Sequence, residues 1–356
     1  MSKSIIVSVG NVKSVEFNNS IDELVNLCIT VDVSCEMVIT QNLKRVHPLF
    51  CCGYGKLLEI KSIIDSLNGE IDLVIFNQEL SPKQIANIEQ ILQVTILDRT
   101  FIILQIFAKR ARTKESIWEI SLAQKKYMYP RLIGFDSGLS RQGGGSFNAR
   151  GAGETKLELN RRKLKEEIAS LEKKILSVKK EKDTSNKERQ KNEIPVVSLV
   201  GYTNVGKSSL VNSIIKIVDK VGENTVESKD MLFTTLTTKS KLIKLNNNSK
   251  PFILVDTVGF IYDMPTILYD SFYTTIKDIT DSKLIVLVES PSDLGISQYD
   301  ECLKILKRIG ADNIPRIRVM TKSDLKGDVT SLEHFNVSNV TMDGIKQLVE
   351  AIEFSI

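Results

Sequence analysis

Short apolar runs alternate with amphipathic stretches through the first hundred residues of this 356-residue chain. Strand-like runs occupy residues 5–9, 37–40, 71–76 and 94–97, and helix-like stretches lie between them at 21–28, 55–67 and 81–92. In the second of these stretches the apolar positions recur on one helical face, at Leu57, Ile60, Ile64 and Leu67. The third begins with Ser81 and Pro82, a pair that favours a helix start. This alternation predicts an α/β fold with a small parallel sheet covered by helices.

The next part of the chain has a helical pattern that is interrupted by glycines. Residues 99–130 predict one long helix that ends at Pro130. Residues 134–153 contain 7 of the 19 glycines, which indicates a flexible segment or one that folds around a ligand. From Thr155 the helical pattern returns, with an apolar heptad seam at Leu164, Ile168, Leu171, Ile175 and Val178. We expect this seam to pack against helix 99–130 as an antiparallel pair, and residues 179–193, which lack the seam, to be solvated.

A buried-strand pattern beginning at Val196 leads into a glycine-bearing loop and another helix. Gly201, Gly206, Lys207 and Ser208 give the spacing G-x-x-x-x-G-K-S between strand and helix, which is typical of a phosphate loop. Backbone N–H groups of such a loop surround a phosphate, the lysine supplies positive charge, and the serine hydroxyl ligates Mg²⁺. The candidate phosphate-binding residues are Gly201, Tyr202, Thr203, Asn204, Val205, Gly206, Lys207, Ser208 and Ser209.

Two later strand ends indicate which nucleotide binds. The first is D-x-x-G, formed by Asp256, Thr257, Val258 and Gly259. Its aspartate would hold Mg²⁺ through water, and the N–H of its glycine would meet the γ-phosphate. The second is Thr321, Lys322, Ser323 and Asp324, where guanine-binding proteins carry N-K-x-D, followed by Val337, Ser338 and Asn339 in a slot that usually reads S-A. Asp324 would accept two hydrogen bonds from guanine, and Lys322 would pack along the base. The order and spacing of these motifs predict a guanine-nucleotide domain.

Composition sets the class of protein but not its chemistry. The length predicts two or three domains, and 42% hydrophobic residues are ample for soluble cores. There is no secretory signal pattern and no apolar run near 18 residues, so we expect a cytoplasmic protein without a membrane span. We also expect a monomer. The five cysteines form no C-x-x-C pair; although His47 lies near Cys51 and Cys52, reduced thiols are expected rather than a metal site.

Positive charge is concentrated in one region. The formal net charge of the chain is +4, yet residues 101–191 alone carry a net charge of +11. This asymmetry indicates a polyanionic partner for that region, and a solvated charged helix is the alternative interpretation.

Several longer strings resemble one family. They are DRTFIILQIFAKRA at 98–111, GAGETKLELNRR at 151–162, VGYTNVGKSSLVN at 200–212, DMLFTTL at 230–236 and DTVGFIYDMP at 256–265. Together they resemble the HflX family of ribosome-associated GTPases over nearly the whole chain. Longer members carry an additional C-terminal domain, so this chain resembles a short form. The resemblance implies an N-terminal domain at 1–191 (an α/β subdomain at 1–98, and a helical pair with the glycine-rich loop at 99–191) followed by a phosphate-loop G domain at 192–356.

The same resemblance implies a biochemistry. It implies hydrolysis of GTP to GDP with Mg²⁺, a large ribosomal subunit and its RNA as partner, and a role in ribosome splitting or rescue. The charge of residues 101–191 indicates that this region makes the contact. It adds Phe233, Thr234 and Thr235 of the first switch to the nucleotide site, with Thr235 as a second Mg²⁺ ligand. The residues then expected to support catalysis are Lys207, Thr235 and Gly259.

Departures from the family pattern limit these expectations. Ala152 stands for Pro, Asn160 for Asp, Glu289 for Asp and Thr321 for Asn. We expect Thr321, together with Asn339, to weaken guanine binding more than to change its identity. Phe260 occupies the position of the water-orienting glutamine of Ras-like GTPases, and a phenyl ring cannot polarise water.

Slow intrinsic hydrolysis is therefore expected, with catalysis resting on the loop, Mg²⁺ and backbone groups, or on a group from a partner. A nucleotide-dependent ribosome- or RNA-binding module with negligible turnover remains an alternative. A phosphate-loop ATPase or nucleotide kinase is a second alternative, against which Asp324 argues.

Overall fold

A computed structural model describes residues 2–67, 69–134, 153–191, 194–218, 239–244, 250–262, 264–271, 278–291, 298–325 and 334–356. The chain forms two compact units. The first comprises Met1–Lys109 and Ile117–Ile175, and the second comprises Arg110–Ser116 and Leu176–Ile356.

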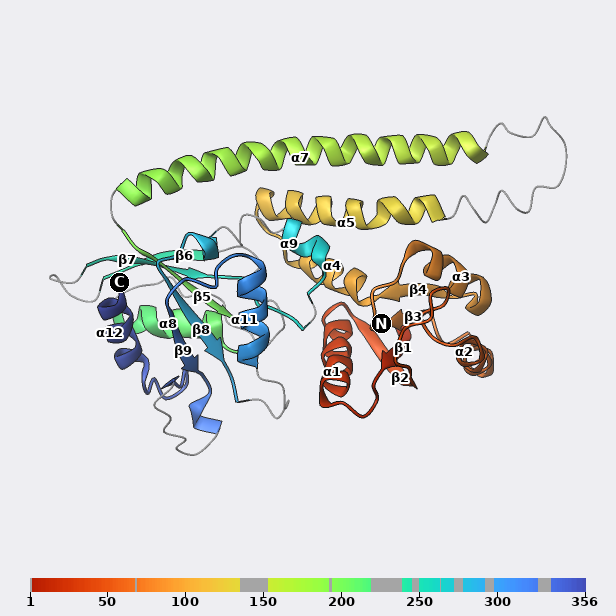
Figure 1. Cartoon of the computed structure of the whole chain (residues 1–356), viewed down its shortest axis with the longest axis horizontal. Coiled ribbons are helices and arrows are strands. Elements are labelled where there is room, and N and C mark those ends of the chain that lie inside the picture. Colours follow the sequence, from red (N-terminus) through yellow and green to blue (C-terminus); the bar gives the residue numbers. More distant parts are fainter. Residues whose placement is uncertain are drawn as a thin grey trace. The chain divides into compact units, whose positions relative to one another are not determined.

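The first unit is built on a four-stranded parallel sheet in the order β2-β1-β3-β4 (Figure 1). Its strands are β1 (Ser2–Gly10), β2 (Val33–Asn42), β3 (Leu73–Phe76) and β4 (Thr95–Asp98). The connecting helices are α1 (Val15–Thr30), α2 (Tyr54–Ser66) and α3 (Pro82–Leu92), the last of which begins with a capping box between Ser81 and Gln84. The parallel sheet and its covering helices, expected from the alternation in the sequence, are confirmed.

Side chains of the inner strands are buried on both faces of this sheet. Ile5 and Val7 of β1 pack in a cluster with residues of α2 and α3, including Leu57, Ile60 and Ile88. Ile6 alternates to the opposite face, which α1 covers, and is also fully buried. Burial on two faces is the reason why these strands read as continuous apolar runs.

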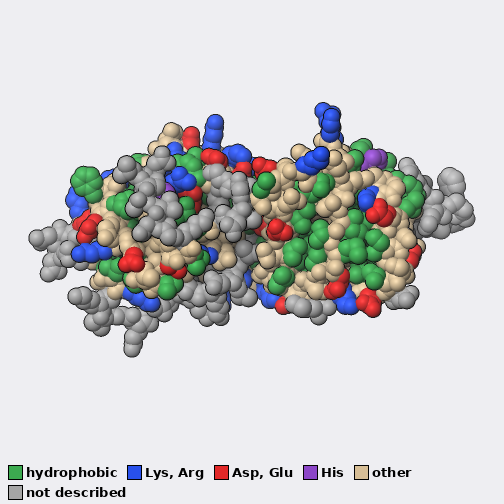
Figure 2. Space-filling model, turned by 90° about the horizontal axis from the view of Figure 1, so that it is seen from below, with side chains coloured by type: hydrophobic (Ala, Val, Ile, Leu, Met, Phe, Trp, Pro, Cys, Tyr) green, Lys and Arg blue, Asp and Glu red, His purple; other side chains and the backbone are tan. Residues whose placement is uncertain are grey.

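Strand β2 is an edge of the sheet. Met37 and Val38 remain 41% and 40% exposed there. Figure 2 shows hydrophobic side chains gathered over the face of this unit that carries β2.

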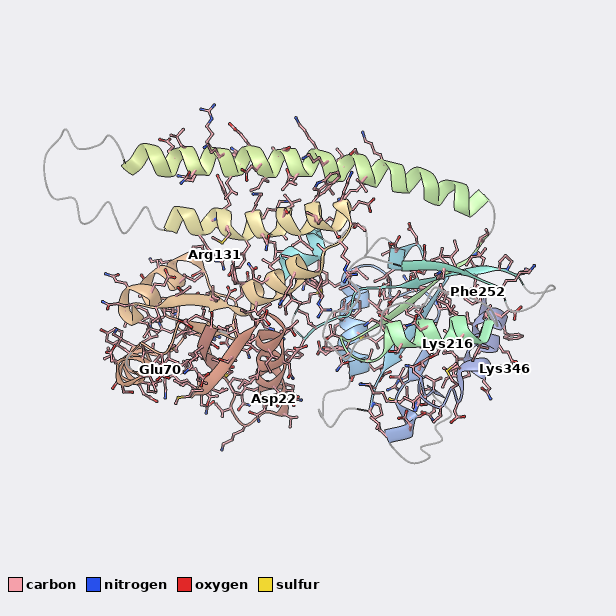
Figure 3. All side chains as sticks on the ribbon, turned by 180° about the vertical axis from the view of Figure 1, so that it is seen from behind. Asp22, Glu70, Arg131, Lys216, Phe252 and Lys346 are labelled. Carbon is pink, nitrogen blue, oxygen red and sulfur yellow. The ribbon has the colours of Figure 1, made fainter. Side chains whose placement is uncertain are left out.

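The prediction of one helix over 99–130 is wrong, because two helices occupy this region. Helix α4 (Arg99–Arg110) ends before α5 (Lys114–Gly134) begins. Thr113 starts the second helix, since its hydroxyl oxygen accepts a hydrogen bond from the N–H of Ser116 at 3.2 Å. Pro130 lies inside α5 and does not end it. The guanidinium of Arg131, labelled in Figure 3, donates to the carbonyl of Tyr127 at 2.7 Å within this last part of the helix.

Helix α5 pairs with the long helix α7 (Gly153–Lys191). Leu122 packs against Leu171 and Ile175 of the predicted seam, with Trp118 and Ile168 beside them. Two ion pairs, Lys125–Glu167 and Lys126–Glu172, flank these contacts at 2.5 and 2.8 Å. Trp118 near the start of α5 lies beside Lys174, with 5.6 Å between its ring centroid and Nζ, whereas Lys125 further along α5 pairs with the earlier residue Glu167. The pair is therefore antiparallel, as the heptad seam predicted.

The second unit contains a six-stranded sheet in the order β10-β9-β8-β5-β7-β6, in which only β6 is antiparallel to its neighbour. Its strands are β5 (Val196–Gly201), β6 (Lys239–Ile243), β7 (Phe252–Asp256), β8 (Leu284–Glu289), β9 (Arg316–Met320) and β10 (Phe335–Asn336). Its helices are α8 (Lys207–Val218), α9 (Thr266–Ser271), α11 (Gln298–Arg308), the 3₁₀ helix η1 (Ser323–Leu325) and α12 (Ile345–Ser355).

Two hydrophobic clusters sandwich this sheet. Val197 and Leu199 of β5 pack with residues of α8 and α12 on one face. Val200 packs with Cys302 and Leu306 of α11 on the other. The parallel strands thus bring their carboxyl ends to one edge of the sheet, where loops in α/β folds bind ligands.

The remaining structural expectations concern cysteines, metals and membranes. All five cysteines are free thiols. Within the described ranges no group of three or more His, Cys, Asp or Glu side chains is arranged to hold a metal ion. None of the helices described is long and apolar enough to cross a membrane.

Candidate functional site

The phosphate loop, residues 201–208, connects the end of β5 to the start of α8. Two of its positions require glycine. A Cβ at Gly201 would lie 2.1 Å from the carbonyl oxygen of Val288 in β8. Gly206 has a φ of 91°, in the region that L side chains rarely adopt. The glycines therefore stand where close strand packing and the turn of the loop need them.

The side chain of Lys207 turns back toward the loop that precedes it. Its ammonium donates to the carbonyl oxygens of Gly201 at 2.9 Å and Tyr202 at 2.6 Å. Burial lowers the pKa of Lys207 to about 8, and the negative charge of Asp256 opposes this shift. Burial disfavours this charge even beside Asp256, and a further anion nearby would favour it, so the ammonium suits a phosphate.

Ser208 and Asp256 meet where α8 begins and β7 ends. The hydroxyl of Ser208 donates to Oδ2 of Asp256 at 2.7 Å, and both side chains are buried. The hydroxyl of Thr257 donates to the carbonyl of Leu199 at 2.5 Å, which connects the end of β7 to β5. A hydroxyl and a carboxylate are oxygen ligands of the kind that Mg²⁺ binds, so this pair fits the cation expected from the sequence.

The segment after β7 is bonded to the phosphate loop through its backbone. The N–H of Phe260 donates to the carbonyl of Gly201 at 3.0 Å, and the N–H of Thr203 donates to the carbonyl of Phe260 at 2.9 Å. A Cβ at Gly259 would lie 2.7 Å from Cγ2 of Thr203 and 3.0 Å from Nζ of Lys207. Gly259 thus lies directly against the phosphate loop.

The ring of Phe260 points away from this site into the hydrophobic core. It is 6% exposed and packs in the cluster that contains Val200, Ile279, Ile285, Leu287, Cys302, Ile305, Leu306 and Ala311. A side chain in this place contributes packing, and it neither orients nor polarises a water molecule.

Two loops that follow β9 and β10 form the other side of the site. The N–H of Ser323 donates to the carbonyl of Val337 at 3.2 Å. The hydroxyl of Ser338 donates to Oδ1 of Asp324 at 2.7 Å. Asp324 is nevertheless exposed, so its carboxylate lies where an acceptor-only group could receive the two N–H groups of a guanine edge.

Thr321, Lys322 and Asn339, which we call the base-side residues, are directed toward the phosphate loop. The Thr321 hydroxyl lies 2.5 Å from the carbonyl oxygen of Val205. Nζ of Lys322 lies 3.2 Å from the carbonyl oxygen of Asn204. Nδ2 of Asn339 lies 3.4 Å from the carbonyl oxygen of Gly206. Residues expected to contact the base therefore also contact the loop.

Glu289, which in the sequence is only a departure from the family pattern, pairs with Arg318, and the sequence did not predict this pair. The guanidinium of Arg318 forms two hydrogen bonds to the Glu289 carboxylate, at 2.6 and 3.1 Å. The same guanidinium lies over the ring of Tyr299, 4.4 Å from its centroid. A glutamate at the end of the otherwise apolar strand β8, next to a strand that carries two arginines, was the available signal for this pair.

The remaining sequence candidates fall into two groups. Ser209 lies in the first turn of α8, and Val258 is buried after β7. Phe233, Thr234 and Thr235 lie outside the described residues, as does most of the glycine-rich stretch at 134–153.

The basic residues that follow this stretch belong to α7. Arg162, Lys163 and Lys165 are exposed, and Arg161 is half-buried. Arg162 pairs with Glu166 at 3.1 Å along the helix surface. An exposed ion pair of this type contributes little stability, so these cations are accessible to a polyanion.

Comparison with protein families divides the chain into three consecutive matches. Residues 18–108 match the model of the GTP-binding GTPase N-terminal region, and residues 110–189 match that of the GTP-binding GTPase middle region. Residues 196–322 match the model of the 50S ribosome-binding GTPase.

Individual relatives cover most of the chain. It is 38% identical to a GTPase HflX of Caldanaerobacter subterraneus subsp. tengcongensis, over 99% of this chain and 80% of that protein. It is 35% identical to the GTPase HflX of Escherichia coli, over 86% of this chain and 70% of that protein. The crystal structure of SsGBP in complex with GDP is similar over the full length of both chains, with 25% identity and a TM-score of 0.50.

Proposed function

The chain belongs to the HflX family of GTPases and has a phosphate-loop GTP-binding domain, and we propose that it uses GTP binding and hydrolysis to act on the large ribosomal subunit, in ribosome splitting or rescue. The observation that carries this proposal is the match of residues 196–322 to the 50S ribosome-binding GTPase model. The net charge of +11 on residues 101–191 supports it, because lysine and arginine neutralise RNA phosphates.

We assign nucleotide contacts to the residues of the site. The backbone N–H groups of the phosphate loop and Lys207 bind the phosphates of GTP. Ser208 and Thr235 would ligate Mg²⁺, and Asp256 would hold it through water. Bound Mg²⁺ supplies positive charge to the β- and γ-phosphates. The N–H of Gly259, which lies against the loop, meets the γ-phosphate and so distinguishes GTP from GDP.

Guanine recognition rests on Asp324. Its exposed carboxylate is held by the hydroxyl of Ser338 at 2.7 Å. Guanine presents N1–H and an exocyclic amine on one edge, an arrangement that adenine lacks, and a carboxylate accepts from both. Lys322 packs along the base.

Hydrolysis is intrinsically slow in this proposal. The Phe260 side chain is buried in the core, so the position of the usual glutamine supplies no group to the attacking water. Rate enhancement therefore depends on ordering of the switch segments, and docking to a partner is the means of ordering them.

We further propose a functional division of the chain at residues 191 and 192. Residues 1–98 and 99–191 form the α/β part and the helical pair of a ribosome-facing domain, and residues 192–356 form the nucleotide-dependent domain. The sheet of residues 2–98 and the α5–α7 pair support the first division.

Co-sedimentation with purified ribosomal subunits tests the proposal. Binding to the large subunit should be stronger with a non-hydrolysable GTP analogue than with GDP. It should also weaken steeply as salt rises, since phosphate contacts release counterions. Equal binding with both nucleotides, or binding that salt leaves unchanged, would contradict it.

A charge-reversed variant locates the contact. Replacing Arg161, Arg162, Lys163 and Lys165 by glutamate should reduce ribosome binding and leave GTP affinity nearly unchanged. The matched control reverses four exposed cations elsewhere in the first unit, at Lys13, Lys44, Arg45 and Lys83. Equal losses in the two variants would show that total charge, rather than α7, determines binding.

A further inference from the structure

Strand β2 forms an edge of the first sheet, and no other strand of that sheet covers its outer side. Leu43 donates its N–H to the carbonyl of Gly10 at 3.2 Å, and Gly10 lies opposite Asn42 in the parallel register with β1. In a parallel pair, every second residue directs both its N–H and its C=O to the same neighbour. Because Leu43 faces β1, the backbone groups of Val38, Thr40 and Asn42 face away from the sheet.

The second half of β2 lacks the features that usually protect an edge strand. Natural sheets block such edges with lysine, with proline or with a bulge. The bulge of β2 lies in its first half, where the register with β1 shifts between Cys35 and Met37. Residues 37–42 read MVITQN and contain neither a charged residue nor a proline. The outward-facing backbone groups of this stretch are therefore open to pairing with another strand.

Apolar side chains accompany this edge on both faces of the sheet. Met37 is 41% exposed and lies on the same face as Ile39, which packs in the cluster with α2 and α3. Val38 alternates to the opposite face and is 40% exposed. Hydrophobic side chains are visible over this part of the unit in Figure 2. Outward-facing backbone groups beside exposed apolar side chains are the features by which a sheet edge binds an extended strand.

The charges at the two ends of this stretch indicate which strand fits. Glu36 precedes the outward-facing residues, Lys44 follows them, and both side chains are exposed. A second copy of β2 in parallel orientation would place glutamate beside glutamate and lysine beside lysine. In antiparallel orientation, each Glu36 approaches Lys44 of the other copy, and opposite charges on neighbouring strands attract. The edge is therefore complementary to a second, antiparallel copy of itself.

One antiparallel register pairs all of the outward-facing residues at once. When Thr40 lies opposite Thr40 of the second copy, Val38 lies opposite Asn42, and each of these pairs exchanges two hydrogen bonds. The same register places the exposed side chain of Met37 opposite that of Leu43, which packs at the margin of the cluster with α2 and α3. The charged residues at the two ends of the stretch then also lie opposite each other, with unlike signs.

We propose that β2 is a dimerisation edge, through which two copies of this chain join their four-stranded sheets into one continuous sheet. A twofold contact of this kind is closed, because each copy uses its β2 edge once. The inference concerns the first unit and does not depend on the nucleotide site. It differs from the monomer expected from the sequence, since backbone groups at a sheet edge become apparent only when the order of the strands is known.

Sedimentation velocity of the full chain at increasing protein concentration tests the proposal. The mass of the parent should rise from 39.9 kDa toward twice that value. Thr40→Pro removes an N–H at the centre of the contact and spares the ladder to β1, because proline is tolerated on the outer side of an edge strand. This variant should remain monomeric at the same concentrations. A parent that stays monomeric throughout would overturn the inference.

Charge variants test the orientation of the two strands. Glu36→Lys and Lys44→Glu each replace attraction by repulsion at both ends of the contact, so each should weaken dimerisation by about tenfold. The double variant, which carries both substitutions, exchanges the two charges and should restore the parental dissociation constant. An equimolar mixture of the two single variants should form mixed dimers. Neither rescue is expected if the single variants are merely misfolded.

A matched control exchanges charges outside β2. Lys13→Glu combined with Glu16→Lys alters two exposed residues of the first unit and should leave dimerisation unchanged. Dimers that Thr40→Pro and both single charge variants leave intact would show that another surface associates, and would overturn the inference. Dimers that the single variants weaken and the double variant does not restore would exclude the antiparallel pairing of β2.

Discussion

Each sheet ends one strand on a fully buried aspartate, Asp98 after β4 and Asp256 after β7. In the first unit four donors surround Asp98. The backbone N–H of Phe101 and the Tyr127 hydroxyl bond Oδ1 at 2.9 and 2.5 Å, and the Leu80 N–H and the Arg131 guanidinium bond Oδ2, both at 3.0 Å. Burial and the charge of Asp98 raise the pKa of Tyr127, so this phenol remains a donor.

Asp256 is likewise the last residue of its strand, but it meets a different group. Its Oδ2 accepts from the hydroxyl of Ser208 at 2.7 Å, and the positive charge of Lys207 lies near enough to interact with it. A hydroxyl at this distance is itself an oxygen ligand, so the two groups can bind one cation together. The carboxylate of Asp98, in contrast, already accepts four hydrogen bonds, so its lone pairs are occupied and it does not suit a cation.

The carboxyl edges of the two sheets differ in the same way. In the first unit the amide of Gln78 bonds both the N–H and the carbonyl of Val9, at 3.2 and 2.6 Å. Arg99 is buried there and bonds Asn77 at 2.9 Å and also Glu23. In the second unit the corresponding edge carries a glycine-bearing loop. In the first unit, side chains of the chain itself bond the groups at the carboxyl edge of the sheet. In the second unit, the same edge presents backbone groups to a ligand. We therefore infer that the first sheet is a scaffold for the helical pair.

The comparison predicts first that Asp98→Ala destabilises the first unit strongly. It removes the negatively charged partner of the Arg131 guanidinium and the acceptor of the Tyr127 hydroxyl, and removing one partner of a buried ion pair costs about 3–5 kcal/mol. Chemical denaturation followed at Trp118, which lies in the helical pair, measures this loss. GDP affinity of the folded variant should equal that of the parent, and a parallel loss of GDP binding would refute the proposed division of roles.

Asp256→Asn should instead reduce the turnover of GTP and leave the stability of the protein nearly unchanged. The amide keeps the size of the carboxylate but lacks its charge, so turnover of GTP should fall by about a hundredfold to a thousandfold, as when one transition-state electrostatic contact is removed. The melting temperature should change little. Steady-state GTP hydrolysis at several Mg²⁺ concentrations measures the effect. Turnover that is close to the parental rate at every concentration would mean that Asp256, like Asp98, is structural.

The pH dependence of nucleotide binding should reveal the buried ammonium of Lys207. Its pKa is about 8 without a ligand because burial disfavours the charge, and a bound phosphate favours the charge. Above pH 8 Lys207 must therefore take up a proton when GDP binds. In this range GDP affinity should fall by about tenfold for each unit by which the pH rises. Stability of the free protein should rise between pH 8 and 10.5, the value for an ordinary lysine, since only the unfolded chain is protonated there.

Isothermal titrations from pH 7 to 10 measure this slope. Asp324→Ala serves as the control, since it should lower the affinity at every pH and leave the slope unchanged. An affinity that is constant across this range would exclude Lys207 as a phosphate ligand whose pKa is lowered by burial.

The smallest effect is expected for Phe260→Leu. Its side chain packs in the core, and a swap between large apolar residues usually costs less than about 1.5 kcal/mol. Turnover of GTP should stay within several-fold of the parent, with and without large ribosomal subunits. Phe260→Ala would instead leave a cavity and cost about 3–5 kcal/mol of stability. Loss of nearly all turnover in a stable leucine variant would give Phe260 a catalytic role.

The order of elements was readable from the sequence because local patterns determine it. Apolar runs buried on two faces predicted β1, β3 and β5, and the heptad positions of α7 predicted an antiparallel helical partner. The glycine spacing predicted the phosphate loop, and the positive φ of Gly206 is a local requirement. The close approach that excludes a Cβ at Gly201 comes instead from Val288 of β8, which is distant in sequence. Phe260 could be judged unsuited to orienting water from the residue type alone, because a phenyl ring has no polar group.

Tertiary contacts decided the rest. Ala111 and Arg112 are good helix formers, so the sequence does not reveal that a second helix begins after Thr113. Helix α5 also continues past Pro130, where Arg131 forms an ion pair with Asp98. The bonds from Thr321 and Asn339 to the phosphate loop join residues 116 and 133 positions apart. Local pattern carries no information over such separations. The sequence therefore determined which groups the site contains, and folding decided which of them face the ligand and which hold the loop.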